Sequence, residues 1–461
     1  MAAARHEPAS RAAAPLLALL LAVAGCAGRD GGSPAAVPPP GFSADTFTRQ
    51  GLIGGATATE AGCKALPDGL WAATRDGRRE CLRHAAAGME GAAGRTALVY
   101  VTGDPEGASY RFAGGRPLLD AVSEHYETSP EARRAVAEAL SAAMGGRPVV
   151  LLARPGMHGS SGDHARDRHT TDEVELVDDA LTRLRQRHGF RDLSLVGFSS
   201  GGAVVANLLA RRGDVRCAAL ASAPLDMAAF HRGRDGAVTD HYAMRNGDMA
   251  DPMRSVVDIR STATVFVLGD RYDRSVPAPA WEAWAAAARR AGLRVHAAEV
   301  GGLDRSELGG GRSHHITGVR ALEVAYACAT GTPGEALRTA LLRGEPILKP
   351  QGRRLGGEEI KAAFAGQRLT GTAWSSFGTG AARYTYWGPG GELSHFHPHR
   401  PAQRIATHRW WVEGDRLCTS DIGCGEVFAD GRFLHLVLGT KRQLGETPHL
   451  STTFVATPPA G

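Results

Sequence analysis

Residues 193–211 read LSLVGFSSGGAVVANLLAR, and this stretch decides the fold. A short apolar run leads to a serine between Gly197 and Gly201, and a run of helix-forming residues follows. The pattern is typical of a buried strand, a sharp turn and a helix. A serine on such a sharp turn projects its hydroxyl above the sheet. The glycines on either side let the neighbouring backbone approach the turn closely. We therefore expect Ser199 to be a nucleophile.

The same alternation of strand and helix extends to both sides of this stretch. Helical patterns separate near-continuous apolar runs at 96–101, 148–153, 193–197, 217–221, 263–269 and 294–300. Such runs predict a parallel sheet that is covered by helices on both faces, which is an α/β fold. The clearest helix is expected at 171–188, with Thr170 or Thr171 as its N-cap and Gly189 as its stop. A β-hairpin is expected around 70–72.

A different pattern begins after about residue 334. One short helix near 358–365 precedes strand-like runs divided by turn signals, at 383–387, 407–412, 416–419, 426–429, 432–438 and 451–455. This predicts a small C-terminal antiparallel β domain, either a barrel or a sandwich. We expect an α/β domain at 42–333, a β-rich domain at 334–461 and a flexible proline-rich linker at 27–41.

Composition fits a globular protein of two folded units. The 461 residues are 43% hydrophobic and 22% charged, values that argue against disorder. The net charge is only +5, from 53 Lys and Arg against 48 Asp and Glu, and the arginines are scattered along the chain, so nucleic acid is not an expected partner.

The N-terminus has the pattern of an export signal. Arg5 and Arg11 precede an apolar run at 16–24 that ends in small residues, as in a secretory signal peptide, and the run is short for a membrane span. Residues 23–26, VAGC, resemble a bacterial lipobox, so we expect lipidation of Cys26, with simple cleavage as the alternative. Either outcome takes the mature chain out of the cytoplasm, and we expect it in the periplasm of the cell envelope, where the lipidated form would be anchored to a membrane.

The six remaining cysteines form an even set, which suits disulfides in an oxidising compartment. Six cysteines allow 15 connectivities. Proximity along the chain and membership of the same expected domain favour Cys63 with Cys81, Cys217 with Cys328, and Cys418 with Cys424, and free buried thiols are the alternative.

A serine nucleophile needs a histidine base and a carboxylate that orients the base. Asp270 and Asp273 both follow the strand expected at 263–269. We favour Asp273 for its place in the loop, and we interpret Asp270 as a turn residue that binds local backbone. The adjacent His314 and His315 come after the last expected strand, and only one can be the base. We favour His315, with His314 as the alternative.

In this order of Ser, Asp and His, residues 96–330 resemble the α/β-hydrolase superfamily of serine esterases and peptidases. The spacing of Gly269, Asp273, Val276 and Pro277 resembles the family's acid loop. The resemblance implies an oxyanion site. Its donors would be the N–H of Ser200 at the helix start and, because Thr102-Gly103 replaces the family's His-Gly pair, the N–H of Asp104. Ser200 lies one position past the turn, so it is the less favoured nucleophile.

The sequence therefore predicts an exported serine hydrolase that cleaves a small-molecule ester or a peptide amide without a cofactor. The doubled glycine after Ser200 also occurs in prolyl-oligopeptidase-type peptidases, so ester and peptide substrates both stay open. A non-catalytic lipoprotein that binds an envelope partner on a hydrolase scaffold is the alternative from another class.

A third possibility is metal-dependent hydrolysis at His395, His397 and His399, which alternate along the chain. Pro398 disfavours a regular strand there, and no carboxylate or thiolate is adjacent. Solvent-facing histidines are therefore the favoured interpretation, and no metal site is assigned.

Overall fold

A computed structural model describes residues 40–114, 116–123, 126–235, 248–273, 275–300, 311–374, 382–397, 400–438 and 449–456. All of these belong to one compact unit, Ala35–Gly461. The expected signal peptide, Cys26 and residues 27–39 of the expected linker lie outside the described residues. Among the helices that are described, none combines the length and apolar character needed to cross a membrane.

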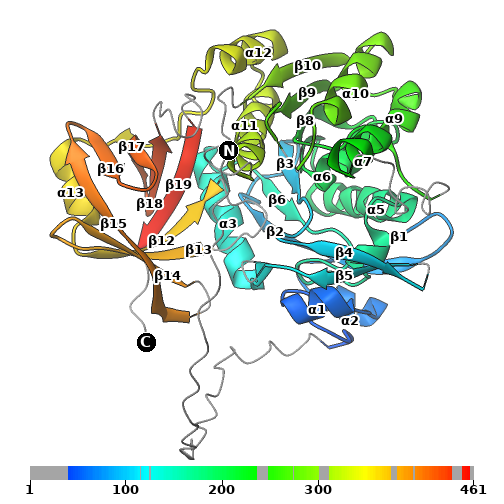
Figure 1. Ribbon diagram of the computed structural model, residues 1–461, viewed down its shortest axis with the longest axis horizontal. Coiled ribbons are helices and arrows are strands. Elements are labelled where there is room, and N and C mark those ends of the chain that lie inside the picture. Colours follow the sequence, from blue (N-terminus) through cyan, green and yellow to red (C-terminus); the bar gives the residue numbers. More distant parts are fainter. Residues whose placement is uncertain are drawn as a thin grey trace, which may run out of the picture. The chain divides into compact units, whose positions relative to one another are not determined.

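An eight-stranded sheet with the order β1-β2-β6-β3-β7-β8-β9-β10 forms the first half of the unit (Figure 1). Its strands are β1 (Gly69–Ala73), β2 (Arg79–Ala87), β3 (Thr96–Val101), β6 (Val149–Leu152), β7 (Asp192–Phe198), β8 (Val215–Ala221), β9 (Thr264–Gly269) and β10 (Arg294–Glu299). The strands from β6 to β10 in this order are parallel, and the β1–β2 hairpin joins β6 antiparallel. The six strands and the hairpin expected from the sequence are confirmed.

Helices cover both faces of this sheet, because each face carries its own buried apolar cluster. One face packs against α5 (Thr171–His188), α6 (Ser200–Leu208) and α10 (Pro279–Arg290), and the other against α3 (Pro130–Ala143), α11 (Gly311–Ala329) and α12 (Gly334–Arg343). The predicted caps of α5 are confirmed. Thr170 accepts a hydrogen bond from the Glu173 N–H, and Gly189 ends the helix at φ 66°.

Several smaller elements were not predicted from the sequence. They are α1 (Arg49–Gly54), α2 (Glu60–Lys64), the hairpin of β4 (Ser109–Ala113) and β5 (Arg116–Ala121), α4 (His164–Asp167), α7 (Met227–Asp235), α9 (Pro252–Ser255) and a 3-10 turn at Val256–Asp258.

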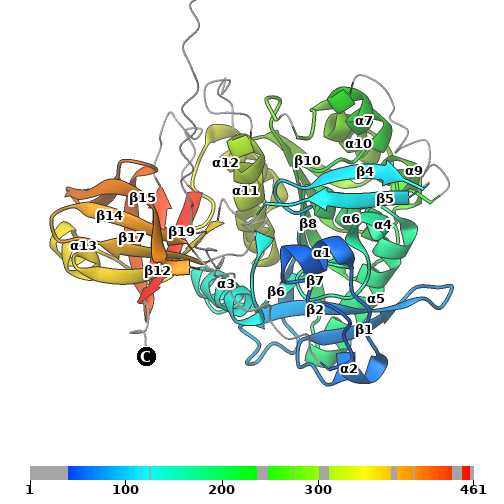
Figure 2. The ribbon, with the colours of Figure 1, turned by 60° about the horizontal axis from the view of Figure 1, so that its bottom comes forward.

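The second half of the unit is a closed antiparallel barrel (Figure 2). Each strand pairs with the next along the chain, and β19 pairs back with β12. The strands are β12 (Gln367–Ala373), β13 (Ala382–Trp387), β14 (Glu392–His397), β15 (Arg400–Glu413), β16 (Arg416–Thr419), β17 (Gly423–Asp430), β18 (Phe433–Leu438) and β19 (His449–Ala456), with the short β11 (Arg353–Arg354) added to β17. Helix α13 (Gly357–Phe364) contributes Ile360 and Phe364 to the barrel core. Of the two architectures expected, the structure has the barrel.

The barrel and the α/β part share one buried cluster. Trp374, Phe428 and Leu450 of the barrel half belong to the same cluster as Leu140 of α3 and Leu322 of α11. The Leu450 N–H also donates to Glu323 Oε1 of α11 over 3.0 Å, where the carboxylate is buried. The two halves are therefore joined by core packing as well as by the chain.

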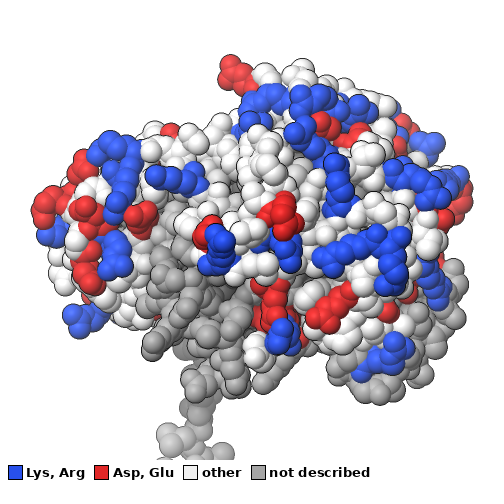
Figure 3. All heavy atoms as spheres, turned by 90° about the horizontal axis from the view of Figure 1, so that it is seen from above, with Lys and Arg blue, Asp and Glu red and all other residues white. Residues whose placement is uncertain are grey.

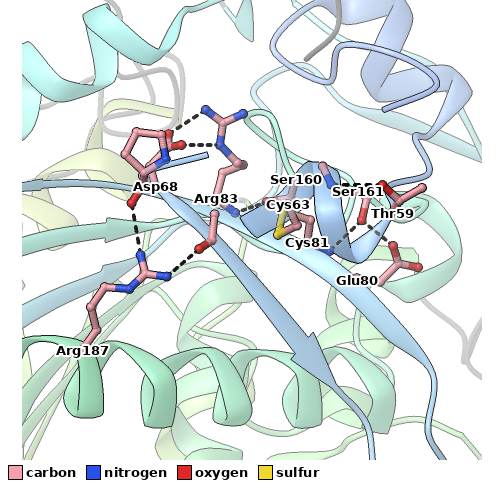
Figure 4. Close-up of a disulfide and its surroundings, with 12 residues drawn as sticks. Thr59, Cys63, Asp68, Glu80, Cys81, Arg83, Ser160, Ser161 and Arg187 are labelled. Atoms are coloured by element: carbon pink, nitrogen blue, oxygen red, sulfur yellow. Dashed lines mark hydrogen bonds and ion pairs between the residues drawn. A yellow bond between two sulfur atoms is a disulfide. The ribbon is translucent and has the colours of Figure 1, made fainter. Parts of the chain in front are cut away.

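The cysteines pair as the sequence suggested: Cys63–Cys81, Cys217–Cys328 and Cys418–Cys424. Figure 4 shows the first pair, which ties α2 to β2 beside a polar network. In this network Ser161 Oγ accepts from the Cys81 N–H at 2.8 Å and donates to Glu80 at 2.6 Å. The disulfide and these bonds fix the N-terminal segment to the edge of the sheet.

Basic and acidic side chains are interspersed on the face shown in Figure 3. This matches the scattered arginines of the sequence.

Candidate active site

Ser199 occupies the turn between β7 and α6 in a backbone conformation that is rare for a residue with a side chain. Its φ is 53° and its ψ is −128°, and its N–H donates to the Ala221 carbonyl at 2.8 Å. Such a conformation costs roughly 1–3 kcal/mol, so the surrounding structure must impose it. Ser199 is half-buried, whereas Ser200 is buried.

The glycines at this turn are required by close backbone packing. A Cβ on Gly197 would lie 2.5 Å from the Gly202 Cα. A Cβ on Gly201 would overlap the carbonyl oxygens of Val101 and Thr102. The strand, turn and helix can therefore meet only with glycine here, as the sequence pattern predicted.

The loop after β3 lies directly against Ser199. A Cβ on Gly103 would be 2.9 Å from the Ser199 Cβ, so the backbone leading to Asp104 passes beside Ser199. Helix α6 begins at Ser200, and a helix N-terminus presents free N–H groups and partial positive charge. Both segments named for the oxyanion site from the sequence thus lie next to the serine.

The side chain of Asp104 is held by cations on the side of α4 and α5. Its carboxylate contacts Arg154 at 3.0 Å, Arg168 at 2.5 Å and His164 at 3.5 Å. Burial by itself would raise the pKa of Asp104, but Arg168, His164 and Arg154 outweigh it and hold the pKa well below its usual range. Burial also lowers the pKa of His164. The carboxylate therefore stays ionised and anchors the loop after β3.

A second buried carboxylate, Glu173, continues this network towards Ser200. Its Oε1 accepts from Arg154 Nε at 2.7 Å, and its Oε2 accepts from the His169 N–H at 2.8 Å. His169 has φ 62°, and its Nε2 lies 2.9 Å from Ser200 Oγ. The Ser200 hydroxyl is therefore hydrogen-bonded to His169, whereas Ser199 occupies the turn itself.

Sequence reasoning gave His169 and Glu173 no role. A signal for Glu173 was present, because it lies one turn before Val177 on the apolar face of α5, where a charge must be paired. His169 had no such signal, since its partner Ser200 is brought to it by the tertiary fold.

Both candidate carboxylates lie in the loop after β9, two strands from β7 in the sheet, and both are buried. Asp273 Oδ1 accepts from the N–H groups of Ser275 at 2.7 Å and Val276 at 3.2 Å. Asp270 Oδ1 accepts from the Tyr272 N–H at 2.9 Å, which is the local bond expected of a turn residue. The loop is thus folded around both carboxylates.

His314 and His315 belong to the first turns of α11, and their side chains lie outside the described residues. The residues that follow in α11 contact the ends of β7 and β8. Thr317 Oγ1 is 2.8 Å from the hydroxyl of Ser222, the residue that follows β8. A Cβ on Gly318 would be 3.1 Å from the ring of Phe198. The first turns of α11 therefore pass beside Phe198 and the end of β8.

Other described features lie away from this turn. A cleft of about 790 Å³ is lined by Asp192, Asp214, Thr264 and His296, at the opposite ends of the strands from Ser199. His395 lies in β14 of the barrel, and the side chains of His397 and His399 are outside the described residues.

The comparisons with known proteins agree with this fold. Residues 126–299 match the protein family described as the alpha/beta hydrolase fold. Together with the sheet order, this match shows that the chain has an α/β-hydrolase fold followed by a C-terminal antiparallel β domain. A search of curated proteins found no match.

The solved structures that match this chain include peptidases and esterases. Acylaminoacyl peptidase of Pyrococcus horikoshii is 11% identical with a TM-score of 0.39, and the match covers 59% of this chain and 44% of that one. An esterase of Pyrococcus furiosus is 15% identical with a TM-score of 0.34, covering 50% of this chain and 80% of that one. A puromycin hydrolase is 17% identical with a TM-score of 0.36, covering 62% and 41%. This chain thus spans less than half of the peptidase, and these likenesses concern the fold alone.

Proposed function

We propose that this protein is an exported serine hydrolase that cleaves an ester or amide bond through an acyl-enzyme on Ser199. The observation that carries the proposal is the strained turn at Ser199, which lies between the start of α6 and the loop after β3. Backbone strain of this kind persists where the fold imposes it, and it is common at active sites. Here it supports a hydroxyl aimed at a bound carbonyl.

In this mechanism Ser199 Oγ attacks the substrate carbonyl and transfers its proton to the imidazole of His315, with His314 as the alternative. Asp273 orients the imidazole and stabilises its positive charge. The N–H groups of Ser200 and Asp104 donate to the oxyanion. The imidazolium then protonates the leaving alcohol or amine, and water releases the acid by the same steps.

Each proposed catalytic residue has a residue of the same type nearby in the sequence, and a substitution of that residue serves as its control. A fluorophosphonate probe should label Ser199, and mapping of the modified peptide identifies the serine. Ser199→Ala should abolish labelling and reduce hydrolysis of p-nitrophenyl esters by roughly 10⁴- to 10⁶-fold, whereas Ser200→Ala should leave the label in place. Comparing His315→Ala with His314→Ala, and Asp273→Asn with Asp270→Asn, assigns the base and the acid.

The outcomes separate the alternatives. A wild-type protein that takes no label and cleaves neither esters nor peptide anilides would be a binding protein on a hydrolase scaffold. Label on Ser200 in the Ser199→Ala variant would refute the nucleophile assignment. The relative rates on esters and anilides distinguish an esterase from a peptidase.

The proposal includes export and lipidation at Cys26. Its support is the basic and apolar N-terminal pattern with the VAGC sequence. Cys26→Ser should move the protein from the membrane fraction to the soluble envelope fraction. An unchanged distribution, with an unmodified N-terminus in mass spectrometry, would contradict lipid anchoring.

A further inference from the structure

The interior of the barrel has two chemically different halves. The half next to α13 is apolar and holds Trp387, against which the rings of Phe364, Trp410 and Phe454 pack edge to face. Beyond this cluster, towards the far ends of β14, β15 and β16, the described residues include His395, His408 and Asp421. The proposed hydrolysis at Ser199 gives this polar group no role.

The strand register turns both histidines towards the interior. Leu393 belongs to the barrel core and lies directly opposite His408, so the two side chains share a face. His395 is two residues beyond Leu393 in β14, and alternate residues in a strand also share a face. His395 and His408 therefore point into the barrel from neighbouring strands.

Asp421 reaches the same place from the turn after β16. The Ser420 N–H donates to the Arg409 carbonyl at 2.9 Å, and the Arg409 N–H donates to Ser420 Oγ at 3.0 Å. These bonds continue the pairing of β15 with β16 for one more residue. They bring Asp421 beside His408.

The three side chains converge at ligand spacing. One nitrogen of each histidine and one oxygen of Asp421 all lie within 4.8 Å of one another, and His395 Nε2 is 3.8 Å from Asp421 Oδ2. Two ligands of a tetrahedral zinc ion, each about 2.1 Å from the metal, are roughly 3.4 Å apart. Small side-chain rotations would therefore close the group around an ion.

The contacts among these groups favour an ion over a direct bond. A separation of 3.8 Å is too long for a hydrogen bond between His395 and Asp421. Asp421 Oδ1 is buried and accepts no hydrogen bond from any described residue. The side chains of His395 and Asp421 are 15% and 22% exposed, so an ion and a water molecule can reach them.

The residues that lie near His395 in the structure, His408 and Asp421, differ from those that the sequence suggested, His397 and His399. The pairing of β14 with β15 shifts on both sides of Phe396, so the simple alternation from His395 to His397 is interrupted. The carboxylate that was missing near His395 comes from Asp421, far along the chain. The other described group with ligand spacing, Glu413 with Cys418 and Cys424, has both sulfurs in a disulfide.

We propose that His395, His408 and Asp421 bind one divalent transition-metal ion, with zinc as the preferred ion. Two imidazoles and one carboxylate suit zinc, and three protein ligands leave one tetrahedral position for water or a further ligand. The site lies in the barrel and does not depend on the serine chemistry.

The test uses tag-free, chelator-treated full-length mature protein with intact disulfides. Isothermal titration with zinc sulfate should show one high-affinity site per chain, and Co²⁺ should give the visible absorption of a tetrahedral ion. His408→Gln and Asp421→Asn should each weaken zinc binding by more than the roughly 10- to 100-fold that loss of an outer-shell partner costs. The matched control, His397→Gln with His399→Gln, should bind as the wild type does.

Asp421→Asn keeps the shape of the side chain, so circular dichroism of this variant separates lost binding from lost folding. The proposal is overturned if the wild type takes up no zinc, if folded Asp421→Asn binds zinc normally, or if only the control variant loses binding. Chelator should leave fluorophosphonate labelling of Ser199 unchanged. Loss of labelling in chelator would count against the metal-free serine mechanism, and zinc titration tests the site independently of that mechanism.

Discussion

Removing the buried carboxylate of Glu173 should destabilise the protein far more than removing an exposed one. The side chains of Arg154 and Glu173 have no exposed surface, and they are joined at 2.7 Å. Loss of one partner from a buried ion pair costs about 3–5 kcal/mol, because the remaining charge stays buried. The Glu173→Ala variant also loses the acceptor for the His169 N–H.

The expected shift in melting temperature follows from the size of the unit. Unfolding about 430 residues at about 2.1 cal/mol/K per residue gives an entropy near 0.9 kcal/mol/K. A loss of 3–5 kcal/mol therefore lowers Tm by about 3–6 °C. Glu127→Ala is the control, because its pair with Arg49 is exposed and contributes at most about 1 kcal/mol, or about 1 °C.

Differential scanning calorimetry of both variants and of Arg154→Met with Glu173→Ala would test this reasoning. The double variant should be less destabilised than the sum of its single variants, since the second substitution removes a buried charge that the first has deprived of its fully buried partner. Equal Tm shifts for Glu173→Ala and Glu127→Ala would refute it.

Three further predictions concern other parts of the chain. Gly201→Ala should abolish probe labelling of Ser199, because its Cβ would overlap two carbonyl oxygens, whereas Gly213→Ala, where the Cβ meets open space, should label normally. Replacing Cys217 and Cys328 by serine removes a disulfide that spans 111 residues, and it should lower the free energy of unfolding in urea by about 5 kcal/mol. The same change at Cys418 and Cys424, which are separated by 6, should lower it by about 2 kcal/mol. Equal losses would contradict the chain-entropy argument. Burial lowers the pKa of His435 to about 4, below its unfolded value near 6.5, so its contribution to stability is present above pH 6.5 and is lost as the pH falls towards 4. His435→Gln should flatten this part of a Tm-against-pH curve, and an unchanged slope would assign the acid sensitivity elsewhere.

The parallel strands were predictable because both of their faces are buried, which leaves continuous apolar runs in the sequence. Strand β2 was harder to recognise, since its Arg83 is buried against Asp68 at 2.7 Å and looks like a surface residue in the sequence. Strand β12 was missed for another reason. Its Gly371 leaves room for the ring of Phe454, so the position carries no apolar signal.

The turn at Ser199 was predictable because its geometry depends on adjacent residues. The group of His395, His408 and Asp421 was not, because strand pairing brings it together and a register shift beside His395 hides the pattern. The same holds for His169 and Ser200, whose contact spans 31 positions of the chain.

The buried cluster that the barrel shares with α3 and α11 affects how this protein can be divided for experiments. A fragment that ends near residue 333 would expose the apolar sides of Leu140 and Leu322 to water, and Glu323 would lose its bond from Leu450. Such a fragment would be prone to aggregation, and its inactivity would say nothing about the serine chemistry. Point substitutions in the intact chain are therefore the sound way to assign roles to the two halves.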